Sequence, residues 1–134
     1  MKKRSVKKLV LLVLVPGLLI SLLTGCGKNT DPSSVSFKDA ISNDRPTLAE
    51  FGRGICIPCK AMKPILEELS VEYKDKLNVV IVEVDANMDI TRQYEIMMIP
   101  TQIFFDSDGK EVFRHVGFFA KEDIIVQLGE MDID

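Results

Sequence analysis

Cys56-Ile57-Pro58-Cys59-Lys60 places two cysteines three positions apart, directly before a helical pattern. Two thiols at this spacing can form and break a disulfide without moving the rest of a fold. The pair is therefore a candidate two-electron redox switch. A purely structural disulfide is the less favoured interpretation, because so short a loop restrains the unfolded chain very little.

The first 25 residues have the composition of a secretory signal peptide. Five basic residues lie within residues 2–8, and an apolar run follows from Leu9 to Leu23, interrupted at Pro16-Gly17. This run is short for a membrane-spanning helix, which needs about 20 apolar residues. We therefore predict a cleaved leader over residues 1–25 rather than a permanent transmembrane anchor.

The end of that segment, Leu23-Thr24-Gly25-Cys26, resembles the lipobox of bacterial lipoproteins. The resemblance implies that Cys26 receives a diacylglycerol on its sulfur and becomes the N-terminus after cleavage. Two acyl chains hold a protein stably at a membrane, whereas a spare free thiol, the alternative, is unfavourable in an exported protein. Residues 26–36 are polar and rich in turn formers, which predicts a lipidated flexible tether. We expect an extracytoplasmic protein, lipid-anchored to the bacterial cell membrane.

Removing residues 1–25 changes the charge of the chain. That segment holds five of the 17 basic residues and none of the 20 acidic ones, so the remainder has a net charge of −8. Nucleic-acid binding requires basic patches, which an acidic surface lacks. We therefore expect no nucleic-acid partner, and membrane contact through lipid rather than through a polybasic face.

Patterns along the rest of the chain predict one α/β domain. Short apolar runs predict four strands, over residues 47–51, 77–84, 101–105 and 110–116. The turn signal Asp106-Ser107-Asp108-Gly109 predicts that the last two form a β-hairpin. Apolar residues at helical spacing predict four helices, over residues 37–41, 61–73, 88–94 and 121–128. We expect residues 77–84 to be buried on both faces, and Pro64 to kink its helix or end its first turn. The order of elements predicts a central mixed β-sheet with helices on both faces.

Four local features, taken with this order of elements, resemble the thioredoxin family over residues 37–134. They are the Cys56–Lys60 stretch at a strand-to-helix junction, Glu50 six positions earlier, Ile99-Pro100-Thr101 ahead of a strand, and Gly117 after the hairpin. The resemblance implies a thioredoxin-like fold and a thiol–disulfide oxidoreductase that needs no cofactor.

Several positions depart from the usual pattern of that family. Ile55 and Ile57 stand where thioredoxins usually have tryptophan and glycine, and the sequence contains no tryptophan. Glu50 stands where the family usually has aspartate, and Ile81 falls where many members have a lysine beside that acid. These departures leave the fold assignment intact and bear on redox potential and partner choice.

The chemical roles follow from the position of each residue. Cys56 is predicted to attack the substrate disulfide, because a helix N-terminus favours the thiolate. Cys59, one turn deeper, is predicted to resolve the mixed disulfide. Glu50, on a predicted buried strand, is expected to exchange a proton with Cys59. The alternative for Glu50 is a solvent-facing position on an edge strand.

Pro100 matches the position whose peptide bond is cis in the thioredoxin family. The resemblance implies that the backbone of Ile99 lies beside Cys56, where an extended substrate pairs like an added strand. We assign Ile57 and Pro58, between the cysteines, to the same substrate-binding surface. The alternative for Pro100 is a trans bond at the start of a strand.

Two further features each allow two interpretations. Met97 and Met98 fit either an apolar rim for docking a partner or the core. His115 fits an exposed strand position better than a metal ligand, because structural zinc needs four ligands and Cys26 is assigned to the lipid anchor. We therefore predict no metal site.

These predictions combine into an extracytoplasmic thiol–disulfide oxidoreductase that acts as a reductase. Disulfides persist outside the cytoplasm unless something removes them. We expect a monomer whose substrates are oxidised exported proteins, and the family resemblance implies a membrane-embedded thiol transporter as electron donor. The alternatives are a disulfide oxidase or isomerase on the same fold, a copper metallochaperone using Cys56 and Cys59, and a redox-silent binding lipoprotein.

Overall fold

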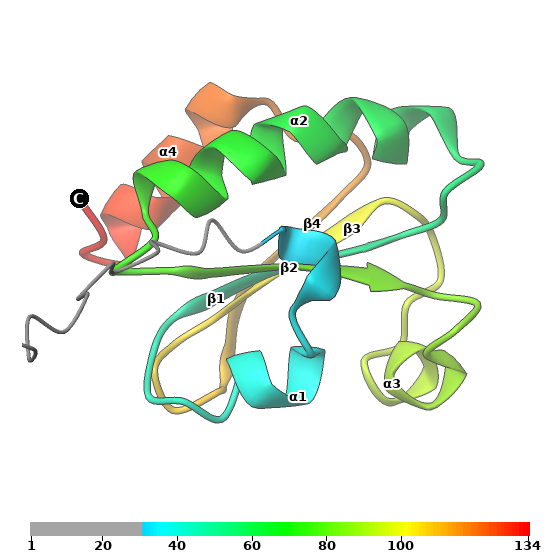
Figure 1. The fold of residues 1–134 in the computed structure, drawn as a ribbon, viewed down its shortest axis with the longest axis horizontal. Coiled ribbons are helices and arrows are strands. Elements are labelled where there is room, and N and C mark those ends of the chain that lie inside the picture. The colour runs from blue at the N-terminus through cyan, green and yellow to red at the C-terminus, as the bar shows by residue number, and fades with distance from the viewer. Residues whose placement is uncertain (1–30) are drawn as a thin grey trace, which may run out of the picture.

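A computed structural model describes residues 31–134, so the predicted leader, Cys26 and the start of the tether lie outside the described residues. The elements run in the order η1 Pro32–Ser34, α1 Phe37–Ala40, β1 Thr47–Gly52, α2 Ile57–Glu72, β2 Asn78–Glu83, α3 Met88–Gln93, β3 Thr101–Phe105, β4 Glu111–Val116 and α4 Lys121–Glu130 (Figure 1). Within this described part, no helix is both long and apolar enough to cross a bilayer.

The four strands form one mixed sheet in the order β2-β1-β3-β4. β1 and β2 are parallel, with α2 as the crossover between them, whereas β3 is antiparallel to both β1 and β4. In this register Glu50 on β1 lies between Ile81 on β2 and Gln102 on β3. The mixed sheet predicted from the sequence is confirmed.

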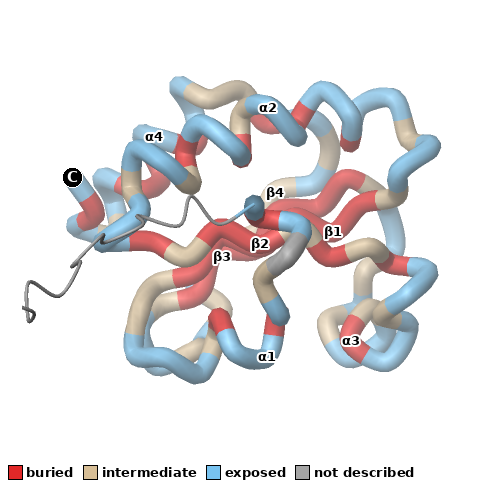
Figure 2. The backbone as a smooth tube through the Cα atoms, viewed as in Figure 1, coloured by how far each residue is buried: buried red, intermediate tan, exposed pale blue. Residues whose placement is uncertain are grey.

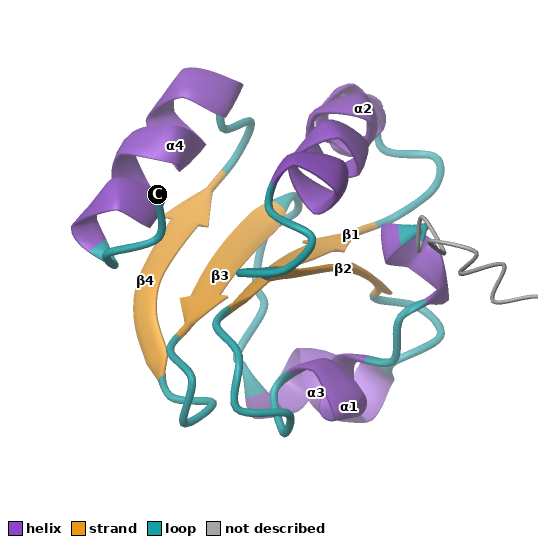
Figure 3. Ribbon diagram, turned by 60° about the vertical axis from the view of Figure 1, so that its left-hand side comes forward, coloured by secondary structure: helices purple, strands orange, loops and turns teal. Residues whose placement is uncertain are grey.

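Helices cover both faces of the sheet, as predicted. α2 and α4 lie on one face, and α1 and α3 lie on the other (Figure 3). Alternate residues of β1 enter separate cores, because side chains alternate across a strand: Leu48 packs under α2 and α4, whereas Ala49 and Phe51 pack toward α1 and α3. Figure 2 shows the resulting band of buried residues along the central strands.

Aromatic packing explains why the four-residue helix α1 forms. A helix this short is not stable by itself. The ring of Phe37 makes edge-to-face contacts with Phe51, Tyr94 and Phe105, at centroid distances of 5.7, 5.3 and 5.7 Å. These contacts fix α1 against the sheet beside α3.

The structure differs from the sequence-based expectation at two places. β2 is an edge strand, and Ile81 is only partly buried although Val80 and Val82 are buried. Pro64 does not end the first turn of its helix, since α2 runs without interruption from Ile57 to Glu72, and the predicted kink stays a prediction. Fully buried Met62, Leu66 and Leu69 hold that helix to the sheet, and their packing outweighs the roughly 3 kcal/mol that an internal proline costs.

The folded region begins five residues ahead of the boundary expected from the sequence. Residues 32–34 of the predicted tether form η1, which contacts β2 and α2. Pro32 is buried, and the side-chain carboxylate of Asp31 accepts a hydrogen bond from the backbone N–H of Ser33. The chain thus enters the domain along the β2 edge of the sheet.

Candidate active site

The two cysteines lie at the N-terminus of α2 and form a disulfide. Cys56 is the N-cap residue, and its sulfur accepts a hydrogen bond from the backbone N–H of Cys59 at 3.3 Å. Cys56 is partly exposed, whereas Cys59 is 7% exposed. The unpaired N–H groups and dipole of a helix N-terminus favour a thiolate there. The geometry therefore fits an accessible attacking sulfur at Cys56 and a protected one at Cys59.

Glu50 is buried on β1 and lies below this helix terminus. Its side chain is 2% exposed, which excludes the solvent-facing alternative. Together with Cys59 it lines a cavity of about 320 Å³. Burial, followed by the negative charge of Glu83, raises the pKa of Glu50 from 4.5 to about 7. A carboxyl group with this pKa both accepts and releases a proton near neutral pH, as an acid–base partner of a thiol must.

Gly52 provides the space into which the Glu50 carboxylate fits. A Cβ atom built on Gly52 would lie 2.5 Å from Oε1 and 2.9 Å from Oε2 of Glu50. These separations are too short for any side chain at position 52 unless the carboxylate moves. The absence of a side chain at Gly52 thus accommodates the extra methylene that glutamate has relative to aspartate.

Two acidic residues at the end of β2 and just after it hold the loop that precedes Cys56. Oε2 of Glu83 accepts a hydrogen bond from the backbone N–H of Gly54 at 3.1 Å. Arg53 forms an ion pair with Asp85, with 2.6 Å between Nη2 and Oδ1. Neither acid was predicted from the sequence to belong to the site. Their position at the end of a strand parallel to β1 was an available signal, because the C-terminal ends of parallel strands meet at one edge of a sheet.

The Ile99–Pro100 peptide bond is cis, as the family resemblance implied. Pro100 is buried, and its carbonyl oxygen accepts a hydrogen bond from the N–H of Gly117 at 2.8 Å. The Thr101 hydroxyl donates to the carbonyl oxygen of Met98 at 2.7 Å. These bonds fix the loop that enters β3. That the Ile99 backbone binds an extended substrate beside Cys56 stays a prediction.

Large apolar side chains next to the cysteines and to Pro100 are exposed to solvent. Ile57 is 81% exposed and Met97 is 89% exposed, and Ile55 and Met98 are also exposed. This excludes the interpretation of the two methionines as core residues. Large apolar side chains that are exposed next to a reactive disulfide are typical of a docking surface for another protein.

Gln102 is a buried polar residue that the sequence analysis did not single out. It is Glu50's partner across the β1–β3 register, is fully buried, and neither polar atom of its side-chain amide has a hydrogen-bond partner in the described part of the chain. Its neighbour on β4 is His115, whose ring stacks on Phe119 at a centroid distance of 4.1 Å. Among residues 31–134, no group of three or more His, Cys, Asp or Glu side chains is placed to hold a metal ion.

Comparisons with known proteins agree with this geometry. A family model described as thioredoxin matches residues 29–130. The chain is 37% identical over 99 residues to a thioredoxin of Alicyclobacillus acidocaldarius, covering 74% of this chain and 93% of that protein. It is 36% identical over 104 residues to a thioredoxin of Mycobacterium bovis, covering 78% and 87% respectively. A thioredoxin of Staphylococcus aureus is 42% identical over 77 residues, covering 58% of this chain and 73% of that protein.

Proposed function

The chain belongs to the thioredoxin family, and from that premise we propose that it is a membrane-tethered, extracytoplasmic reductase of protein disulfides. It is a thiol–disulfide oxidoreductase of that family, with Cys56 and Cys59 as its redox pair. The observation that carries the proposal is the Cys56–Cys59 disulfide at the start of α2, above the buried carboxyl group of Glu50.

The proposed reaction transfers two electrons from the dithiol to a substrate disulfide. The Cys56 thiolate attacks one substrate sulfur and forms a mixed disulfide, and the second substrate sulfur leaves as a thiolate that takes a proton. Cys59 then gives its proton to the ionised carboxylate of Glu50, and the resulting thiolate attacks the sulfur of Cys56. The first substrate sulfur leaves as a thiolate and takes the proton from Glu50, so the substrate departs as a dithiol, Glu50 is ionised again, and Cys56 and Cys59 are left as a disulfide. A thiol donor must reduce this disulfide before the next cycle.

The location and direction of the reaction are supported by the N-terminal sequence. A leader over residues 1–25 and lipidation of Cys26 would hold the domain on the outer side of the cytoplasmic membrane. Disulfides accumulate there, so a dithiol protein in that place has oxidised exported proteins as substrates. A membrane-embedded thiol transporter would supply the electrons.

Trapping of mixed disulfides tests the reaction. Cys59→Ser removes the resolving sulfur, so we expect this variant to accumulate covalent complexes with exported proteins that a reducing agent releases. The matched control Cys56→Ser lacks the attacking sulfur and is expected to form none. Equal amounts of complex with both variants, or none with either, would rule out the proposed attack by Cys56.

The direction is tested by the equilibrium of the Cys56–Cys59 pair with glutathione. A reduction potential of roughly −270 mV supports a reductase, whereas one of roughly −120 mV identifies an oxidase. The measurement uses the folded domain and needs no substrate. It therefore separates the direction of the reaction from the identity of the client proteins.

A further inference from the structure

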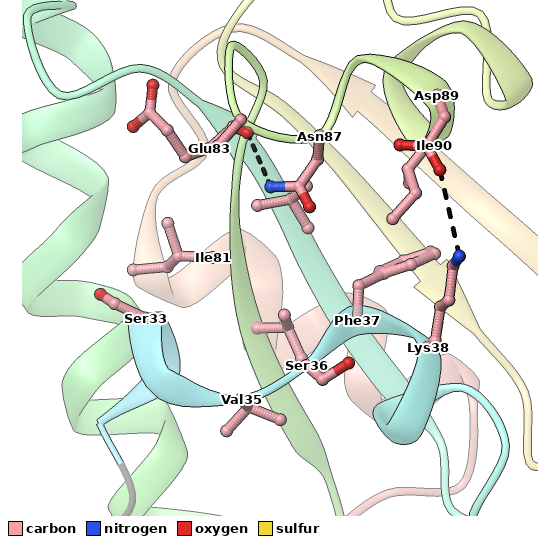
Figure 4. Close-up of a pocket in the computed structure, with 13 residues that line it drawn as sticks. Ser33, Val35, Ser36, Phe37, Lys38, Ile81, Glu83, Asn87, Asp89 and Ile90 are labelled. Carbon is pink, nitrogen blue, oxygen red and sulfur yellow. Dashed lines mark hydrogen bonds and ion pairs between the residues drawn. The ribbon is translucent and has the colours of Figure 1, made fainter.

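Glu83 lies between two hollows of the protein. One is the cavity of about 320 Å³ that Glu50 and Cys59 line, and the other is a groove of about 590 Å³ along the outer edge of β2. Ser33, Ile81 and Glu83 line both. In Figure 4 the carboxylate of Glu83 points away from Asn87 and toward α2, the side on which the redox cavity lies.

The Glu83 carboxylate acts on two different parts of the site. Through Oε2 it accepts the hydrogen bond from Gly54, two residues before Cys56. The Cys56 N–H in turn donates to the carbonyl oxygen of Arg53 at 3.0 Å, so the loop held by Glu83 continues directly into the attacking cysteine. Through its charge Glu83 disfavours ionisation of Glu50, as a like charge near a buried carboxyl group must.

Other charged groups border the same cavity. Lys60 and Lys63 line it from α2, and Arg53 lines it from the loop after β1. Arg53 is engaged by Asp85, which lies just beyond β2.

The remaining groups that face Glu50 or its cavity come from the η1 side, from β3 and from β2. On the η1 side, Asp31 interacts electrostatically with Lys63. From β3, the residue facing Glu50 in register is the neutral Gln102. Glu83 is the acidic residue that lines the cavity together with Glu50.

We propose that Glu83 is a positioning residue for the thiol–disulfide reaction: one carboxylate oxygen holds the loop before Cys56, and its charge faces the cavity that Glu50 and Cys59 line. This inference rests on the proposed function, in which Glu50 accepts the proton of Cys59. A Glu50 carboxylate that is harder to ionise is also a stronger base toward Cys59. Glu83 acts through Glu50 and the loop and does not itself contact the reacting sulfurs in the proposed steps.

The charge effect is tested by titrating Glu50 through its side-chain carboxyl ¹³C resonance in the oxidised protein. Glu83→Gln keeps the size of the side chain and an oxygen acceptor for Gly54 but removes the charge. We expect the midpoint of Glu50 to fall by at least about half a pH unit. The matched control is Asp89→Asn, which removes a charge from the groove of Figure 4 but not from the redox cavity, and is expected to leave the midpoint unchanged.

The positioning effect is tested by amide hydrogen exchange at Gly54. Glu83→Gln is expected to retain slow exchange, whereas Glu83→Leu, which has no acceptor, is expected to speed it by about tenfold or more. Glu83→Asp serves as the conservative variant. Because it keeps the negative charge, its Glu50 midpoint should stay close to the wild-type value. Because its side chain is shorter, the Gly54 amide should exchange faster than in the wild-type protein.

Activity gives a separate readout. In reduction of insulin by the wild-type protein, the rate should rise with pH through the midpoint of Glu50, and Glu83→Gln should shift this rise to lower pH by the same amount as the titration. An unchanged Glu50 midpoint in Glu83→Gln overturns the inference, whatever the activity. A shifted midpoint in a protein that reduces no disulfide supports the effect of Glu83 on Glu50 and overturns the proposed function instead.

Discussion

The carboxylate of Glu50 lies in the space that a side chain at Gly52 would occupy, two residues further along β1 on the same face of the sheet. A glutamate at position 50 needs room for its extra methylene, and a glycine at position 52 provides that room. The two residues should therefore behave as a unit when either is changed.

Gly52→Ala is expected to destabilise the protein by about 1–3 kcal/mol, because its Cβ displaces a buried carboxylate from a packed site. Urea unfolding of the oxidised protein measures this. Gly129→Ala is the control, since a Cβ there meets no atom within 4 Å, and alanine is the better helix former within α4. Combining Gly52→Ala with Glu50→Asp should cost less than the sum of the single changes, because aspartate withdraws the carboxylate from the new methyl group. Strict additivity would contradict the proposed steric coupling.

The stability of the oxidised protein should fall as the pH rises from about 4.5 to about 7. Glu50 has a pKa of about 7 in the folded protein and an ordinary value of 4.5, so in this window the folded state binds the proton more tightly than the unfolded state. Stability from this group is complete below the lower value, is lost as the pH rises through the higher one, and then stays level. The difference is on the order of 3 kcal/mol.

Unfolding free energies of the wild-type protein and of Glu50→Gln, compared across that range, isolate this contribution. The glutamine variant cannot ionise at position 50, so the difference between the two proteins should grow with pH up to about 7. Parallel curves for the two proteins would show that Glu50 titrates normally in the folded state.

Met97→Ser should weaken the reduction of protein disulfides but not of small ones. The methionine is 89% exposed and lies three residues before the cis proline Pro100, so a docked protein substrate would bury it. Loss of roughly 1 kcal/mol of apolar contact predicts about a fivefold lower kcat/KM with insulin and an unchanged rate with a small aromatic disulfide. Val126→Ser on α4, another exposed apolar position, should change neither rate. An equal loss of rate with both substrates would mean that Met97 affects the reactivity of the cysteines and not the docking of a protein substrate.

Cys26→Ala should abolish the incorporation of labelled fatty acid into the protein in cells, as follows from the proposed lipid anchor. Metabolic labelling followed by isolation of the protein measures the incorporation. Cys59→Ser, which changes a cysteine within the folded domain, should leave the incorporation unchanged. Equal labelling of Cys26→Ala and the wild-type protein would refute lipid attachment at this residue.

Much of the fold follows from patterns local in the sequence. The run from Leu48 to Phe51 is apolar apart from its glutamate, which was enough to predict a buried strand with a buried Glu50. The Asp106–Gly109 turn predicted the β3–β4 hairpin, and the cysteine spacing predicted the redox pair. The cis bond before Pro100 required the resemblance to a family, because nothing in the neighbouring residues alone distinguishes cis from trans.

The remainder depends on contacts between distant parts of the chain. The hydrogen bond from Gly54 to Glu83 joins residues 29 positions apart and exists only because β1 and β2 are adjacent and parallel. The burial of Gln102 depends on the place of β3 inside the sheet, between β1 and β4, which the pattern of β3 does not reveal. Similarly, the continuation of α2 through Pro64 is decided by packing against the sheet, which overrides the local preference of proline.

The packing of η1 against β2 has a consequence for how far the enzyme can reach. Only four residues lie between Cys26 and Asp31, where the described chain begins, so the two Cα atoms are at most about 18 Å apart. On the proposed lipidation of Cys26, the domain would operate within a thin layer above the bilayer, with the chain entering beside Ser33 and thus next to the redox cavity. A donor embedded in the same bilayer would meet the disulfide at high effective concentration. Exported proteins would be reduced at the membrane surface, soon after they emerge, rather than in the surrounding fluid.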